Sequence, residues 1–382
     1  MCLMETDNLW IDARINIQVI NFYGMQRITL CVPLLSCRKM KSFNYTFLAI
    51  VLTLASCQSN DKDNGEVDFS ESVTLQDGNV LVSNCDPVDY MVLCDSLLWI
   101  AGQDQNELLH VYDVSGKLLD SGMSIGQGGD DVLEVSSIRS INGKIYVYDS
   151  RGGVIDEVVC RDGKLDATGI VRDMRFQDDA FMLPDSSMLA LPLNSSNAYV
   201  MLDSEGSILD SLSYFPPKPD GISDATHYLA CTGKLAYSPA DTTFARTVAY
   251  DGGIDFFAVK NGRISHTARY ANFDMVYTTY RDEGKFPVPS DESRVGYSHV
   301  YATPDNFYAS YSEQKCLDNP TGMSNEIHVF DHNGKPQYKM LFEHPIQAFA
   351  VSEDDAHLYV AEADNDDDTV IKHYILQSKP NK

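Results

Sequence analysis

The sequence predicts an all-β protein, a six-bladed β-propeller, and three observations predict it. A strand–turn–strand unit recurs along the chain, strand patterns dominate, and no long amphipathic helix pattern appears. The unit is clearest in HVYDVSGKLL (His110 to Leu119) and returns in four later stretches, 157–166, 199–210, 256–265 and 327–338. Each copy places a Gly after Ser, Asp, Glu or Asn, where a tight hairpin needs a residue with positive φ.

Four short strands can be drawn around each of these turns, and they divide the chain into five full units and one incomplete unit. The units span 88–122, 136–170, 180–214, 234–270, 298–342 and 346–376. The sixth unit has three strands only, and the stretch Glu71 to Ser83 can supply the fourth. We expect this N-terminal strand to close the ring, because closure removes the open sheet edges that would otherwise aggregate.

The N-terminal region has the features of a secretory signal. Arg38, Lys39 and Lys41 are followed by an apolar run, Phe43 to Leu54, that is too short to span a membrane. The tetrapeptide Leu-Ala-Ser-Cys that ends at Cys57 resembles the bacterial lipobox, which implies cleavage before Cys57 and lipidation of its thiol and new amino terminus. A rival lipobox ends at Cys37, but its apolar run is shorter and contains a Pro.

These features predict four segments. Residues 1–39 are expected to be an upstream extension from a mis-assigned start, 40–56 a lipoprotein signal peptide, 57–67 a polar tether and 68–378 the propeller. The expected location is the outer membrane, facing the periplasm or the cell surface.

The formal net charge of −26 argues against nucleic acid or anionic lipid headgroups as partners. We therefore expect the protein to meet the membrane only through its lipid anchor. Apolar residues make up 44% of the chain, which is enough for a substantial core.

Two stretches carry a family resemblance. SIGQGGDDVLEV (Ser124 to Val135), HVYATPDNFYASYSEQ (His299 to Gln314) and the order of the units resemble the TolB-like six-bladed propeller lipoproteins of Bacteroidetes. The resemblance covers nearly all of the predicted mature chain and implies the propeller fold. It implies no chemistry, because the family as a whole has no settled activity.

No catalytic residue, metal site or cofactor is predicted. The segment Gly122 to Gly126 matches a nucleophile elbow around Ser124, but a loop follows it where that motif needs a helix. The His residues show neither an HExxH motif nor a paired spacing on one strand. Five cysteines follow Cys57, so at least one has no partner within the chain; Cys85 and Cys94 could form a bridge, and small buried thiols are the alternative.

Ligands of propellers usually bind at the mouth of the central channel. Aligning the repeats places Arg139 and Tyr301 at equivalent positions on innermost strands, and the long insertion Ala271 to Gly296 is expected to fold over one mouth. The insertion and the strand after it supply the remaining candidates, which are Tyr280, Arg281, Arg294, Tyr297 and His299. Arg and Tyr in an acidic protein suit an anionic or sugar-like ligand.

Two hypotheses about function follow. The first is a lipid-anchored binding or scaffold module for an unidentified protein, small-molecule or carbohydrate partner at the channel mouth. The alternative is a propeller hydrolase or lyase acting on a carbohydrate or lactone, which needs convergent acids or a metal cage in the channel.

Overall fold

The computed structural model describes the chain in segments, and it divides the chain into two compact units, Met1–Asn60 and Asp61–Lys382. The described residues are 18–22, 25–29, 65–102, 106–126, 131–172, 174, 177–193, 195–277, 292–319, 321–363 and 368–376. In the first unit β1 (Gln18–Phe22) pairs antiparallel with β2 (Met25–Thr29). The predicted signal peptide and Cys57 lie outside the described residues.

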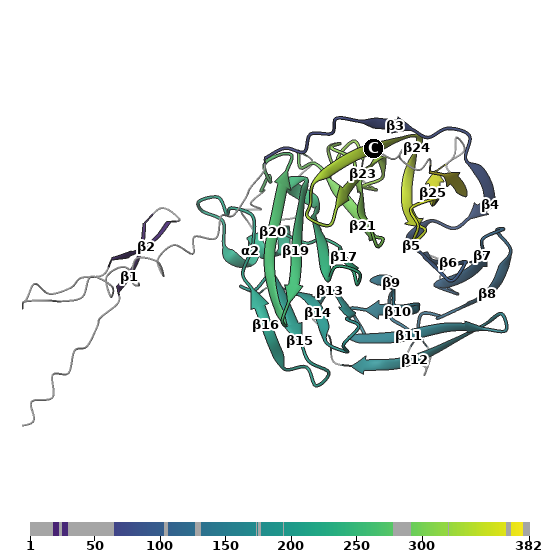
Figure 1. Ribbon diagram of the computed structural model, residues 1–382, viewed down its shortest axis with the longest axis horizontal. Coiled ribbons are helices and arrows are strands. Elements are labelled where there is room, and N and C mark those ends of the chain that lie inside the picture. Colours follow the sequence, from purple (N-terminus) through teal and green to yellow (C-terminus); the bar gives the residue numbers. More distant parts are fainter. Residues whose placement is uncertain are drawn as a thin grey trace, which may run out of the picture. The chain divides into compact units, whose positions relative to one another are not determined.

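The second unit is a ring of sheets, the blades, arranged around a central axis (Figure 1). Blade 1 holds β5 (Val88–Cys94), β6 (Leu97–Gly102), β7 (Leu109–Asp113) and β8 (Leu118–Gly122), and blade 2 holds β9 (Ser137–Ile141), β10 (Lys144–Asp149), β11 (Val154–Arg161) and β12 (Lys164–Arg172). Blade 3 holds β13 (Gln177–Met182), β14 (Met188–Pro192), β15 (Tyr199–Leu202) and β16 (Ile208–Leu212), and blade 4 holds β17 (Leu235–Ser238), β18 (Thr243–Val248), β19 (Gly253–Lys260) and β20 (Arg263–Ala271). Strands adjacent in sequence are hydrogen-bonded neighbours in each blade.

The remaining strands form one eight-stranded sheet that contains two blades. They are β21 (Tyr297–Ala302), β22 (Asn306–Tyr311), β23 (Ser324–Asp331), β24 (Pro336–Val351), β25 (His357–Ala363), β26 (Thr369–Ile375), β3 (Ser72–Thr74) and β4 (Asn79–Cys85). Blade 5 holds β21, β22, β23 and the first part of β24, and blade 6 holds the last part of β24 with β25, β26 and β4. The 16-residue strand β24 belongs to both blades, because residues 336–341 pair with β23 and residues 348–351 pair with β25.

The hairpin turns follow from the turn residues that the sequence supplies. Two-residue turns such as Asn142–Gly143 and Asn261–Gly262 place both residues at positive φ, between 53° and 73°, which matches the twist of the flanking strands. Longer turns begin with an Asp whose carboxylate accepts backbone N–H bonds; Asp113 Oδ1 accepts from Ser115 and Lys117. The Gly of every repeated unit has positive φ, as the sequence predicted.

The ring is closed by the N-terminal strand. Strand β4 pairs antiparallel with β26, with Val80 opposite Lys372 and Cys85 opposite Thr369, and so completes blade 6. The sequence placed closure in the stretch 71–83; the first part of that stretch, β3, instead pairs in parallel with β24 and extends blade 5. The N-terminal segment therefore joins the last two blades.

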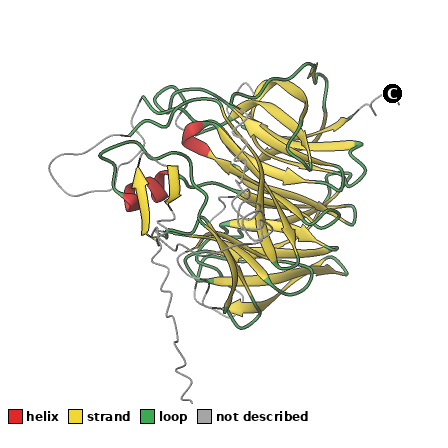
Figure 2. Cartoon of the chain, turned by 60° about the vertical axis from the view of Figure 1, so that its left-hand side comes forward, coloured by secondary structure: helices red, strands yellow, loops and turns green. Residues whose placement is uncertain are grey.

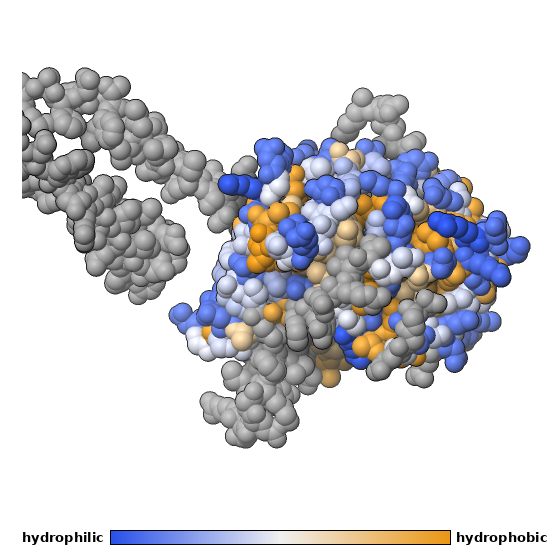
Figure 3. Space-filling model, turned by 90° about the horizontal axis from the view of Figure 1, so that it is seen from below, coloured by the Kyte–Doolittle hydropathy of each residue, from blue (hydrophilic) through white to orange (hydrophobic). Residues whose placement is uncertain are grey.

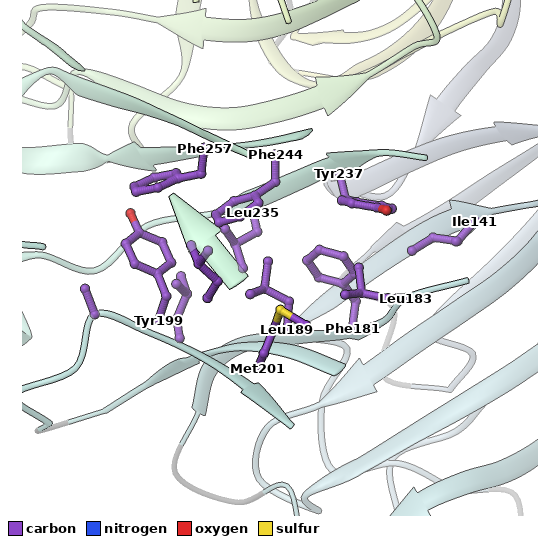
Figure 4. Packing of buried hydrophobic residues seen from close by; sticks show 13 residues of the cluster. Ile141, Phe181, Leu183, Leu189, Tyr199, Met201, Leu235, Tyr237, Phe244 and Phe257 are labelled. Carbon is purple, nitrogen blue, oxygen red and sulfur yellow. The ribbon is translucent and has the colours of Figure 1, made fainter. Parts of the chain in front are cut away.

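The core consists of six apolar clusters, one between each pair of neighbouring blades. Figure 4 shows the cluster between blades 3 and 4, where the Tyr199 ring centroid lies 4.3 Å from that of Phe257 and Phe244 stacks on Phe257 at 4.8 Å. Burying each such ring stabilises the fold by about 1.5–3 kcal/mol. The cluster between blades 6 and 1, which includes Ala350 and Met91, completes the ring.

Strands account for most of the regular structure, and the helices are short (Figure 2). Helix α2 (Asp224–Ala230) precedes β17, and a 3₁₀ helix, Ala249–Asp251, follows β18. The face drawn in Figure 3 is mostly hydrophilic, with apolar residues in separate patches. None of the helices in the described residues is long and apolar enough to cross a membrane.

Ring closure can be tested with two glycines of the same conformation. Gly116 (φ +87°) and Gly206 (φ +84°) lie in equivalent turns, but an added Cβ would overlap the Leu81 carbonyl oxygen of β4 at Gly116 and would meet nothing within 4 Å at Gly206. We expect Gly206→Ala to lower the free energy of unfolding by about 1 kcal/mol through backbone strain. Gly116→Ala should cost at least about 1 kcal/mol more, because β4 must shift.

Urea unfolding of the purified protein and both variants measures the difference. Equal losses in the two variants would show that β4 does not contact the blade 1 turn.

Candidate functional site

The innermost strands of the blades surround the central axis (Figure 1). They are β5, β9, β13, β17, β21 and the last part of β24, and neighbouring members contact one another, β13 and β17 through the hydrogen bond from the Leu235 N–H to Asp179. Each blade has four antiparallel strands, so its outermost strand runs opposite to its innermost strand. The chain then turns back into the innermost strand of the next blade, and all six innermost strands therefore run in the same direction. A cavity of about 140 Å³ lies between them, lined by residues of β5, β9, β17, β21 and β24 and of the turns that follow these strands.

The carboxyl ends of the innermost strands form an exposed mouth. Asn142, Pro239, Ala240, Pro304 and Glu353 line the cavity, follow the ends of their strands and are exposed. The aromatic residues Tyr237, Tyr301 and Phe349 form part of the wall. The Tyr301 and Phe349 ring centroids lie 6.3 Å apart, and the Leu93 N–H donates to the Tyr301 hydroxyl at 3.3 Å.

The amino ends of the same strands are joined by buried polar contacts. Lys234 Nζ donates to the Tyr90 hydroxyl at 2.6 Å and to the Ser136 carbonyl at 3.2 Å. The Arg139 guanidinium donates to the Leu235 carbonyl at 3.1 and 2.8 Å and forms an ion pair with Asp179. The side chain of Asp179 is 0% exposed, so this ion pair is excluded from solvent on its acidic side.

Further bonds extend these contacts to every innermost strand. The Leu235 and Gly233 N–H groups donate to Asp179 and Asp178 at 3.1 and 3.0 Å. On the other side of the axis the Val88 N–H donates to Gln347 Oε1, and His299 Nε2 donates to the Asp89 carbonyl, both at 2.9 Å. We call these side chains the polar belt: Tyr90, Arg139, Asp178, Asp179, Lys234, His299 and Gln347.

Burial sets the protonation states in the belt. Burial and, to a lesser degree, the nearby Lys234 charge together lower the pKa of His299 to about 4, so the imidazole is neutral at pH 7. Its Nε2–H donates to Asp89, which leaves Nδ1 to accept from Ser298 Oγ at 3.3 Å. Burial lowers the pKa of Lys234, but Tyr90, Asp179 and Asp178 together raise it above its ordinary value, so Lys234 stays charged.

Arg139, His299 and Tyr301 are the sequence candidates that the fold brings together at the cavity. Arg139 and His299 are bonded within the belt, so they position strands rather than present free groups. Lys234, Tyr90, Tyr237 and Glu353 were not anticipated. The sequence held one signal for Lys234, since a basic residue stands directly before the short apolar strand 235–238.

Two candidates lie away from the cavity. Tyr297 is 0% exposed in the core between blades 4 and 5, and its hydroxyl bonds to His328 Nδ1 at 2.8 Å. It is therefore a packing residue here rather than a ligand contact. Arg294 pairs with Glu313 at 3.2 Å and lies 6.0 Å from the Phe273 ring centroid, so it sits outside the cavity lining.

The insertion between blades 4 and 5 attaches at the belt end of the ring, since it leaves the last strand of blade 4 and enters the start of β21. The Phe273 N–H donates to the Asp251 carbonyl at 3.2 Å, and the Tyr277 hydroxyl bonds to His227 Nδ1 of α2 at 2.6 Å. Tyr280 and Arg281 lie outside the described residues, so the prediction that they contact a ligand stands as a prediction.

The remaining motifs carry no nucleophile. Ser124 Oγ donates to the Asn106 carbonyl at 2.6 Å, and the described residues between Ser124 and β9 form no helix. Cys85, Cys94, Cys160 and Cys231 are free thiols, so no bridge joins Cys85 to Cys94. Burial raises the pKa of Cys231 to about 12, which keeps its thiol protonated. Among the described residues no group of three or more His, Cys, Asp or Glu could hold a metal ion.

Comparison with known proteins decides the family. The model of the TolB-like 6-blade propeller-like family matches residues 68–354, a range that takes in all six innermost strands. The chain belongs to this family. The resemblance to TolB-like six-bladed propellers is thereby confirmed, and so is the six-bladed ring.

Solved structures similar to this TolB-like propeller share little sequence with it. A Bacteroides fragilis NCTC 9343 protein described as exported has 12% identity and a TM-score of 0.51, over 80% of this chain and 99% of its own. A streptogramin B lyase has 13% identity and a TM-score of 0.40, over 80% of this chain and 87% of its own. Such distant likeness shows the fold alone. No curated protein matches the sequence.

The belt predicts a pH dependence of stability. The pKa of His299 is depressed from its ordinary 6.5 to about 4, so the unfolded chain binds this proton more readily as pH falls through that interval. The contribution of His299 to stability is therefore fully present above pH 6.5 and is lost as the pH falls towards 4. Between pH 7 and pH 5 this histidine should contribute a loss of about 1–2 kcal/mol.

His299→Gln keeps an N–H donor for Asp89 and removes the titration. Urea unfolding at both pH values should give a smaller loss for this variant than for the wild type, while the other histidines titrate in both. Identical losses would rule out a neutral, buried His299.

Proposed function

We propose that this TolB-like propeller is a lipid-anchored binding module of the cell envelope that takes a group of its ligand or partner at the exposed mouth of the axial channel. The observation that carries the proposal is the cavity of about 140 Å³ at the axis. Five blades contribute to its wall, its rim residues are exposed, and the polar groups at its other end are bonded to one another.

The size of the cavity supports recognition of a single group. A cavity of about 150 Å³ admits a molecule of the size of benzene, whereas pockets for whole ligands measure about 300–1,000 Å³. The channel suits one side chain or a substituent of that size, and the remainder of the ligand would rest on the rim. A partner protein that inserts one side chain meets this requirement.

The anchor is the second part of the proposal. The lipobox at Cys57 and the polar tether 57–67 would hold the propeller at the outer membrane. Labelling cells with a fatty acid and comparing the wild type with Cys57→Ala tests it, since retention of the label by the variant would exclude Cys57 as the lipid site.

A hydrolase or lyase acting on a carbohydrate or lactone is the alternative. Such chemistry needs an acid and a base that face a bound substrate. The His299 imidazole is neutral and donates to a backbone carbonyl, and the Arg139 and Lys234 cations bond to belt partners. These groups are committed to holding the ring, which favours binding as the activity of the channel.

The proposal predicts that blocking the mouth abolishes binding. Ala240 lines the cavity and is exposed, so Ala240→Trp should fill the mouth without disturbing a blade core. The matched control is Ser204→Trp, in an exposed outer turn of blade 3. We expect ligand-observed NMR with a mixed set of small amines, carboxylates, sugars and apolar amides to detect binding to the wild type and the control, weakened at least about ten-fold in Ala240→Trp.

A wild type that binds none of the four classes, or an Ala240→Trp variant that binds as the wild type does, would refute a ligand site at this mouth.

A further inference from the structure

We propose that the channel mouth selects a cationic group, an ammonium or guanidinium on an alkyl stem, rather than an anion or a sugar. This inference rests on the proposed function and names the chemistry of the same site. The group belongs either to a free amine or to a Lys or Arg side chain of a partner.

The turns that follow the innermost strands are acidic in five of the six blades. The acids are Asp95 in blade 1, Asp185 in blade 3, Asp241 in blade 4, Asp305 in blade 5, and Glu353, Asp354 and Asp355 in blade 6. All of them except the half-buried Asp355 are exposed. Blade 2 has Asn142 and Gly143 in this turn, and the following Lys144 pairs with Glu157 at 2.8 Å.

These turns lie together on the face that contains the mouth. Asn306 Nδ2 donates to Asp355 Oδ2 at 2.6 Å, which joins the turns of blades 5 and 6. His332 contacts both Asp241 Oδ2 at 2.8 Å and the Thr303 carbonyl at 3.1 Å, which joins blades 4 and 5. The acids of five blades therefore lie on the face that contains the opening, where Glu353 lines the cavity, and their fields add there.

Other basic residues of this face lie farther from the axis. The outer hairpin turns, between the third and fourth strands of their blades, end at Lys117, Lys164, Arg263 and Lys335. The same turns also carry acids, among them Asp113, Asp162 and Glu205, so both signs of charge are present there. The net charge of −26 draws cations to the protein.

The cavity itself supplies contacts that suit a cation. The Glu353 carboxylate lines it and makes no ion pair with a described residue. Below it, the rings of Tyr237, Tyr301 and Phe349 line the wall, and aromatic faces attract ammonium and guanidinium groups. Leu93, Ile141 and Val351 give the same wall apolar surface for an alkyl stem.

The cations of the belt do not oppose this selectivity. Arg139 forms an ion pair with Asp179, and the Asp178 and Asp179 charges act on Lys234. Two positive side chains thus face two acidic ones at the closed end of the cavity. The expectation of an anionic or sugar-like ligand depended on free Arg and Tyr groups, and the pairing of Arg139 removes its main support.

The test uses four probes and the full-length protein at low salt. N-acetyl-lysine amide, its neutral analogue N-acetyl-norleucine amide and its acidic counterpart N-acetyl-glutamate amide differ mainly in charge, and spermidine represents a free amine. NMR titration should show the lysine probe binding at least about ten-fold tighter than the norleucine probe. A lysine probe that binds tighter than spermidine identifies a protein partner as the source, and the reverse order identifies a free amine.

Glu353→Gln should weaken binding of the lysine probe about five-fold. The control Glu205→Gln removes an equally exposed charge from the outer turn of blade 3 and should leave that affinity unchanged. Equal binding of the lysine and norleucine probes, tighter binding of the glutamate probe, or equal losses in the two variants would overturn the inference.

Failure of this inference can be separated from failure of the binding site. If sugars, carboxylates or apolar amides bind in a way that Ala240→Trp blocks while amines do not, the mouth is a binding site and its selectivity for cations is wrong. If Ala240→Trp reduces the binding of none of the probe classes, the mouth is not a binding site and the proposed function is wrong as well.

Discussion

The buried polar belt is the contact on which the rest of the propeller depends. Apolar clusters between blades are non-directional, so they favour packing but do not by themselves fix how the six innermost strands are placed around the axis. The belt does, because Arg139 reaches Asp179 and Leu235 only when blades 2, 3 and 4 are correctly placed. Removing one partner of such a buried pair leaves an unpaired charge, at a cost of about 3–5 kcal/mol.

The same belt determines where the channel can act. It occupies the amino ends of the innermost strands, and Lys234 and Arg139 are held there by Tyr90, Asp179 and the Leu235 carbonyl. The positive charges nearest the axis are thereby paired inside the protein, and the turns that follow the innermost strands at the opposite end carry exposed acids in five of the six blades. One strand arrangement thus supplies both the rigidity of the ring and the negative character of its mouth, which links the stability of the fold to the proposed recognition of a cation.

The ring could be predicted from the sequence because its determinants are local. Gly116 and its counterparts mark a hairpin in each blade, and the missing strand of blade 6 required an N-terminal partner. The site was harder to predict from the sequence, because its contacts join different blades. Arg139 and Asp179, for example, are 40 residues apart. Tyr297 lies in the core although Tyr301 of the same strand lines the cavity; the pairing of β21 with β22 shifts register between Tyr297 and Val300, which breaks the simple alternation of faces.

A double-mutant cycle on Arg139 and Asp179 tests the role of the belt most directly. Arg139→Met and Asp179→Asn, alone and together, are compared by urea unfolding. We expect each single change to lower the free energy of unfolding by about 3–5 kcal/mol. The double change should cost at least about 2 kcal/mol less than the sum of the two single losses, because neither charge is then left unpaired. Losses that add to within about 0.5 kcal/mol would show that the two side chains act independently and would contradict a belt that holds the ring.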